Sequence, residues 1–252
     1  MTTGLVRIVT LGALATLLAG ATPGVPRLTL KEVSAALARA APGAPADFSG
    51  RDLSYLDLSG LDFKQANLRG ATLFGADLTD ANLAGATLAE ANLDRTVIIR
   101  ANFAGANLAK ATMMAAVAYA SLDTSSGPAP SFAGADLSGA HIVARLGHAN
   151  LRGAILTDAQ LGFSVRELRI NIYSDLSGAE LSGAKLMRAD LRRVRLPFAD
   201  LAHADLSDAD LTRADLFHAD LTGADLTGAN LTDANIAETV LRPGAPPAGS
   251  QQ

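Results

Sequence analysis

Between residues 46 and 241 the chain repeats a pattern of apolar and polar positions every five residues, as in Ala66-Asn67-Leu68, Ala71-Thr72-Leu73 and Ala76-Asp77-Leu78. We call the Leu of each unit its centre. A helix cannot use this period, because successive centres would move around the helix axis by about 140°. Extended chain within each unit places the Ala and the Leu on one side and the intervening Asp, Asn or Thr on the other. The pattern therefore predicts short extended segments with an apolar inner side.

The chain must also bend after every centre. The next Ala follows three residues later, an odd number that would turn it outward in a flat strand. Glycine often lies at this bend, two residues after a centre, as at Gly50, Gly70 and Gly105. Glycine reaches backbone conformations that other residues avoid. Repetition of extended segment and bend predicts a parallel coil.

With so many tandem copies, the unit of Ala, Asp or Asn, and Leu or Phe resembles the pentapeptide-repeat family. The resemblance implies an all-β fold, a right-handed quadrilateral β-helix in which four units make one square coil. Residues twenty apart would then stack at about 4.8 Å. About 40 units imply about ten coils. Two columns are expected to be Glu180, Asp200 and Asp220, and Lys185, Asp205 and Asp225.

Residues 1–21 have the features of a secretory signal peptide. Arg7 precedes an apolar run from Ile8 to Ala19, and Ala19-Gly20-Ala21 offers a cleavage site. The run is well short of the roughly 20 residues that span a bilayer. We therefore expect a periplasmic or secreted protein with no transmembrane span in the mature chain. The protein would be cytoplasmic if this segment is not a signal.

Residues 22–45 are expected to be a linker and a capping helix. Thr29 to Glu32 form a capping-box sequence, and apolar residues at helical spacing predict a short helix to about Ala40. Such a helix could cover the open end of the coil, which repeat folds require. Residues 242–252 are rich in proline and are expected to form a disordered tail.

Two interruptions are expected within the repeat region 46–241, near 123–131 and 162–174. At the first, Val117 is expected to be a centre, which places a one-residue slip after Met113. At the second, Arg166 and Asn171 occupy expected centres, and neither belongs unpaired in an apolar core, so the segment should bulge outward. Such loops on a rigid scaffold often carry binding function. They could equally be tolerated insertions.

Composition agrees with a narrow, uniform core. The chain is 49% hydrophobic but only 4% aromatic, and we expect large rings to overfill the bore. The absence of Cys excludes disulfides and thiolate metal sites. The net charge of −4 is too mild to predict direct nucleic acid binding. This net charge is the sum of two unlike regions, a basic stretch around 185–195 and an acidic C-terminal third.

The candidate partner-binding residues form two groups. The first lies in the second interruption: Arg166, Glu167, Arg169 and Tyr173. The second is an acidic ladder at successive outward positions: Asp200, Asp205, Asp210, Asp215, Asp220 and Asp225. The ladder could imitate DNA phosphates, since members of the resembled family that act on topoisomerases do so. Asp is also simply the usual residue at this position of the repeat.

Nothing in the sequence predicts an enzyme, a cofactor or a metal. His203 and His218 lie in bends fifteen residues apart and should fall on different sides of a coil. The sequence contains no H-E-x-x-H, G-x-S-x-G or P-loop motif, and the nonapeptide calcium pattern is missing. We expect a non-enzymatic, exported scaffold that mediates protein–protein interaction. The alternative is a DNA-mimicking binder of a type II topoisomerase. The partner and the oligomeric state are left open.

Overall fold

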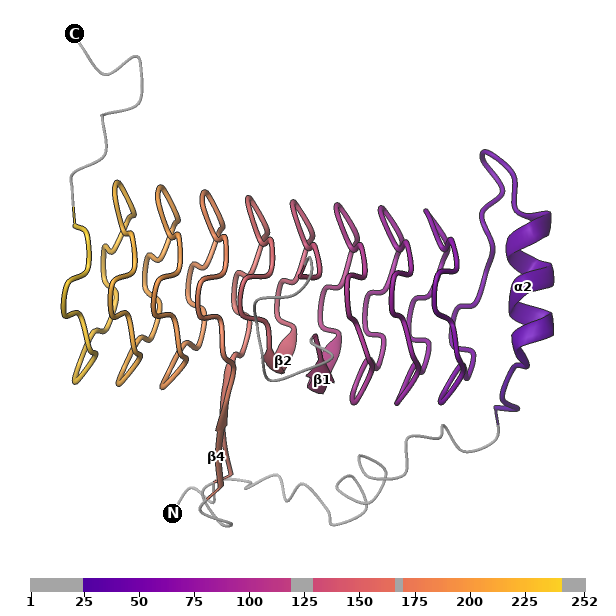
Figure 1. Ribbon diagram of the computed structural model, residues 1–252, viewed down its shortest axis with the longest axis horizontal. Coiled ribbons are helices and arrows are strands. Elements are labelled where there is room, and N and C mark those ends of the chain that lie inside the picture. Colours follow the sequence, from indigo (N-terminus) through magenta and orange to yellow (C-terminus); the bar gives the residue numbers. More distant parts are fainter. Residues whose placement is uncertain (1–24, 119–128, 166–169, 242–252) are drawn as a thin grey trace, which may run out of the picture.

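A computed structural model describes residues 25–118, 129–165 and 170–241. One helix, α2 (Leu30–Arg39), lies at one end of a stack of coils (Figure 1). The named strands are β1 (Thr112–Val117) and β2 (His141–Arg145), which pair in parallel, and β3 (Gly162–Val165) and β4 (Ile170–Tyr173), which pair antiparallel. The remaining coils are joined by single parallel bridges. The predicted all-β quadrilateral β-helix with a helical cap is confirmed.

The bridges divide the outward positions into four columns, one on each face of the rod. The first face begins at Asp47, the second at Asp52, the third at Asp57 and the fourth at Asp62, and each column steps twenty residues in the regular coils. Glu180, Asp200 and Asp220 share the fourth column, as predicted, and Lys185, Asp205 and Asp225 share the first. The third face matters most below: Asp57, Asp77, Val97, Val117, Arg145, Asp175, Arg195, Asp215 and Asn235.

In the regular coils, each corner places one residue in the left-handed backbone region, two residues after a centre. Gly50 (φ 64°) and Gly105 (φ 63°) show the expected glycine, while Arg193 (φ 62°) and Phe198 (φ 59°) take the same conformation with a side chain. At Gly178 (φ 64°) the ring of His148 lies 2.6 Å from where a Cβ would be. Glycine is needed there for both space and conformation.

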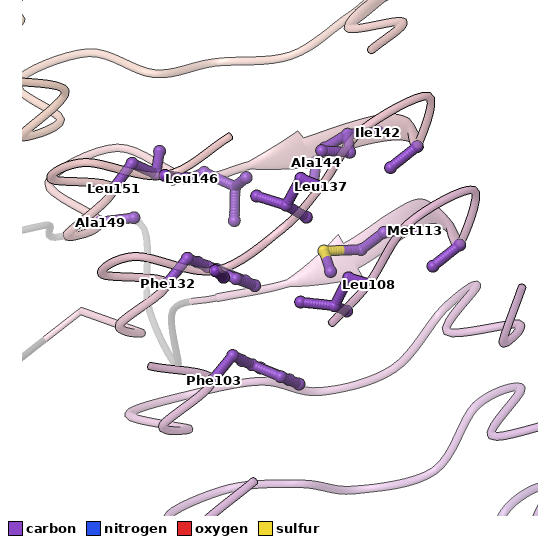
Figure 2. Close-up of a cluster of buried hydrophobic side chains, with 14 of the residues drawn as sticks. Phe103, Leu108, Met113, Phe132, Leu137, Ile142, Ala144, Leu146, Ala149 and Leu151 are labelled. Carbon is purple, nitrogen blue, oxygen red and sulfur yellow. The ribbon is translucent and has the colours of Figure 1, made fainter. Parts of the chain in front are cut away.

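The core consists of the Ala and Leu of each unit, which are almost completely buried except in the last coil. Figure 2 shows centres from successive coils stacked above one another. The expectation that large rings would overfill the bore was wrong, because Phe48, Phe63, Phe103 and Phe132 are all buried centres. The rings of Phe103 and Phe132 lie parallel with centroids 4.8 Å apart, so that adjacent coils share the extra volume.

The first interruption does not shift the register where expected. Val117 is 44% exposed at an outward position, whereas Ala116 and Ala118 are buried, so the first block continues one unit further with Ala118 as its centre. Asn102 then pairs with Ser131, twenty-nine residues on, so this coil holds nine extra residues. The expected loop residues 123–128 lie outside the described residues. A one-residue deletion follows, since Ser131 pairs with Asn150, nineteen residues on.

The second interruption leaves the rod as an antiparallel hairpin. Arg145 pairs with Asp175, thirty residues on, so this coil has ten extra residues, which include β3 and β4. Figure 1 shows the hairpin projecting from the rod. Counted from Asp47 onward, each of the four columns therefore holds nine members, which gives nine coils rather than the expected ten. The two insertions, nine and ten residues long, take up the difference.

The helix covers the N-terminal end of the core. In its capping box the Thr29 N–H donates to Glu32 Oε2 over 2.7 Å, and the Glu32 N–H donates to Thr29 Oγ1 over 3.3 Å. Val33 is fully buried against the first coil. At the other end of the described chain, Ile236 and Leu241 are 48% and 56% exposed. Residues 1–21 and 242–252, predicted as a signal peptide and a tail, lie outside the described residues.

Candidate functional site

The six aspartates of the predicted ladder do not share one face. Consecutive members lie on successive faces, and only residues twenty apart stack directly. Asp200 and Asp220 lie on the fourth face and Asp205 and Asp225 on the first. Asp210 and Asp215 lie on the second and third faces. The acidic positions therefore wind around the rod.

Each of these carboxylates caps its own turn. Asp205 Oδ1 accepts bonds from the Ser207 N–H (3.0 Å) and hydroxyl (2.5 Å), and Asp210 Oδ1 accepts the same pair from Thr212. The Oδ1 atoms of the other four accept the backbone N–H two residues on at 2.8–3.3 Å: Asp200, Asp215, Asp220 and Asp225. This is an Asx-turn, which Asp and Asn form equally well. It is a sufficient structural reason for the preference at this position.

The capping hydrogen bonds also lower the pKa of two of the capping carboxyl groups. The Thr227 hydroxyl, and then its N–H, lower the pKa of Asp225. The Ser59 hydroxyl and N–H likewise lower the pKa of Asp57. Hydrogen bonds to a carboxylate favour its charged form. These two capping groups are therefore ionised at neutral pH.

Arginines interrupt the acidic columns. Arg152 lies 2.9 Å from Glu180 and 3.8 Å from Asp200 on the fourth face. On the second face, Arg192 lies 2.5 Å from Asp190 and 3.8 Å from Asp210. These pairs are half-exposed, so each contributes about 0–1 kcal/mol of stability. They do, however, neutralise the ladder where it meets the basic stretch.

Of the candidates in the second interruption, only Tyr173 can be placed. It ends β4, where the hairpin returns to the third face, and its side chain is 43% exposed. Arg166, Glu167 and Arg169 lie outside the described residues. At the opposite side of the hairpin base, Gly162 passes so close to the rod that a Cβ there would lie 2.3 Å from the Arg192 carbonyl oxygen.

A cluster of rings at one corner was missed in the sequence. Phe198, 62% exposed, stacks on His218 (centroids 5.0 Å apart) and meets Phe217 edge-on at 5.8 Å. His218 Nε2 lies 2.9 Å from Glu238 Oε2. The sequence did contain a signal for this cluster, namely the bulky Phe198 at a bend position where glycine is common. His203 and His218 lie at different corners, as predicted.

Among the described residues, no three His, Asp or Glu side chains gather in a way that could hold a metal ion. Within that same part of the chain, no helix has the length and apolar character needed to cross a membrane.

A family model and several solved structures similar to this chain all belong to the same family. A family model described as pentapeptide repeats matches in eight copies, and the matched ranges are residues 46–80, 76–113, 174–213, 196–233 and 209–242. The crystal structure of HetL, a pentapeptide repeat protein involved in heterocyst differentiation regulation from the cyanobacterium Nostoc sp. strain PCC 7120, is similar. It is 32% identical, with 79% of this chain and 86% of HetL covered and a TM-score of 0.59.

Two further solved structures superpose less closely. A pentapeptide repeat protein from the Arabidopsis thaliana thylakoid lumen is 30% identical, with 45% of this chain and 66% of that chain covered and a TM-score of 0.27. Full-length QnrB1, a plasmid-mediated fluoroquinolone resistance protein, is 17% identical, with coverage of 75% and 93% and a TM-score of 0.30. No curated protein matches the chain.

Proposed function

This chain belongs to the pentapeptide-repeat family, and we propose that it is a non-enzymatic scaffold that binds a protein partner. The observation that carries the proposal is the β3–β4 hairpin, which projects from an otherwise regular rod (Figure 1). The regular faces use their outward Asp and Asn side chains to cap their own turns. Binding capacity then concentrates where the chain departs from the repeat. HetL, which takes part in regulation of differentiation, is a relative compatible with such a role.

The test is co-purification from the cells that naturally express the chain. Because the hairpin coil spans thirty residues and the regular coil twenty, deletion of 163–172 restores the regular spacing and keeps the rod continuous. We expect a specific protein to co-purify with the intact chain and to be lost with this deletion. The matched control removes nine residues between Val117 and Ser131, which also restores a twenty-residue coil. If both deletion variants retain the partner equally, the hairpin has no role in binding. If no protein is enriched with the intact chain, the scaffold function is contradicted.

The alternative function, a DNA-mimicking binder of a type II topoisomerase, has weaker support. The carboxylates of Asp200 to Asp225 are spread over four faces, and arginines lie against Asp200 and Asp210. A supercoiling assay with purified gyrase separates the two functions. Inhibition that disappears when the six ladder aspartates become asparagine would favour mimicry over the scaffold.

We also propose that the scaffold is exported to the periplasm or secreted, on the basis of the apolar run from Ile8 to Ala19. Amino-terminal sequencing of the protein from its native cells tests this. A mature chain that begins near Thr22 is expected. An uncleaved chain in the cytoplasm would contradict export.

A further inference from the structure

The exposed large apolar side chains are distributed unevenly around the rod. Apart from the helix and the last coil, the described residues include four that are more than a third exposed: Tyr55, Val117, Tyr173 and Phe198. All four border the third face. Val117 lies in its column, Tyr55 and Tyr173 lie just before it, and Phe198 lies at the corner that follows. Scattered apolar residues need no explanation, but Tyr173 and Phe198 belong to adjacent coils, which indicates a contact surface on the C-terminal half of the face.

Arginines gather on the C-terminal half of the same face. Arg145, Asp175 and Arg195 are successive members of the column, and Arg193 lies at the corner two residues before Arg195. The closest approach of Arg195 to Asp175 is 3.6 Å, outside ordinary hydrogen-bond distance. Among the described residues, Arg145 and Arg193 form no ion pair. The group carries an excess of positive charge.

Tyr173 lies among these arginines. It is two residues before Asp175, just as Arg193 is two residues before Arg195, and Asp175 and Arg195 are paired in register. Phe198 completes the surface, and its ring is held in place by His218 and Phe217. An anchor that is ordered before binding loses less conformational entropy when a partner docks.

We propose that Arg145, Tyr173, Arg193, Arg195 and Phe198, the Arg–Tyr patch, bind an acidic segment of a partner protein that also carries apolar side chains. This inference rests on the proposed scaffold function and extends the binding surface from the hairpin onto the rod at its base, where Tyr173 ends β4. Arg and aromatic residues are enriched at protein interfaces and dominate their binding energy. Arginine in particular binds carboxylates with two parallel hydrogen bonds.

The surrounding charges favour a short protein segment over a nucleic acid. Asp57 and Asp77 lie further along the same column on one side, and Asp215 follows on the other. Arg145 and Arg195 are two coil steps apart, or roughly 10 Å. A continuous phosphate backbone would run past them onto carboxylates, whereas a peptide with two or three acidic residues would not.

The test begins with selection of peptides from a random dodecapeptide phage library on the full-length chain. Selected peptides are then labelled with fluorescein, and their affinity is measured by fluorescence anisotropy. We expect sequences that combine Asp or Glu with Phe, Trp or Leu, and affinity that falls as salt is raised. The double variant Arg145→Ala/Arg193→Ala and the single variant Tyr173→Ala should each weaken binding about tenfold or more, as expected for loss of an interface anchor.

A matched control removes two cations from the first face, Arg69→Ala/Lys185→Ala, and should leave the affinity within about twofold. Thermal unfolding of every variant confirms that the fold is intact. The patch would be overturned by an equal loss of affinity in both double variants or by tighter binding of a single-stranded oligonucleotide. It would also be overturned if no peptide is selected, or if the selected peptides lack acidic residues. A partner that co-purifies with the chain but is unaffected by the patch variants would remove this inference and leave the scaffold standing.

Discussion

Asp205 offers the sharpest test of why aspartate fills the outward position. Its Oδ1 accepts the Ser207 N–H over 3.0 Å and the Ser207 hydroxyl over 2.5 Å. Asparagine keeps an oxygen in the same place, whereas alanine removes the acceptor. The pair Asp205→Asn and Asp205→Ala therefore separates the hydrogen bonds from the charge.

The expected magnitude follows from the two bonds. A typical intramolecular hydrogen bond contributes about 1 kcal/mol net. The hydroxyl is only partly buried and can turn to water, so Asp205→Ala should lower the free energy of unfolding by about 1–2 kcal/mol. For a domain of this size that corresponds to a fall in Tm of roughly 2–8 °C. Asp205→Asn should stay within about 0.5 kcal/mol of the wild type.

Urea and thermal unfolding of the full chain, followed by circular dichroism, measure both variants under identical conditions. Replacing all six ladder aspartates enlarges the difference, because the six caps lie at separate turns and should add approximately. A loss for Asp205→Asn as large as that for Asp205→Ala would refute the capping argument. It would show that the carboxylate charge itself stabilises the position.

Three other predictions concern single sites. Gly162→Ala should destabilise the rod by about 1–3 kcal/mol in urea unfolding, because the new Cβ would meet the Arg192 carbonyl oxygen at 2.3 Å. Burial raises the pKa of Asp94, whose Oδ1 accepts the Met114 N–H over 2.8 Å. The folded state thus holds its proton more tightly, so wild-type stability falls as pH rises through that pKa. Asp94→Asn should raise Tm at pH 7, with the gain vanishing in acid. Phe198→Gly should leave Tm within about 3 °C of the wild type yet weaken binding of the selected acidic peptides.

Much of the fold follows from local rules that a single sequence displays. The five-residue period requires a bend after each centre, and Gly50 and Gly105 mark it. Once four units close a coil, Asp200 must lie beside Asp220, and it does. The helix could also be predicted from the sequence, because a capping box and an apolar stripe are both local patterns.

The register at the first interruption and the role of the acidic residues were harder to predict from the sequence. Val117 resembles a centre because it is apolar, but burial depends on its coil neighbours, and the small Ala118 fills the core instead. Asp and Asn were interpreted as a surface feature, whereas each is tied to an N–H two residues later. The recurrence of Asp and Asn every five residues was the available signal, but recurrence alone does not distinguish a capping group from a surface charge. The grouping of Arg145 with Arg193 needed the length of the hairpin insertion, which only the pairing of Arg145 with Asp175 supplies.

The corners show where this fold can accept function. A corner residue must adopt a positive φ, which costs a side chain of ordinary shape about 1 kcal/mol or more relative to glycine. Stability alone would therefore favour glycine at position 198, as at Gly178 one coil earlier. Phe198 instead carries a ring that is 62% exposed and thus buries little apolar area. Its contacts with His218 and Phe217 offset part of the strain. Side chains are common at the corners of this rod, so the feature that marks this corner is an exposed ring on the same face as Arg195, as a binding surface requires.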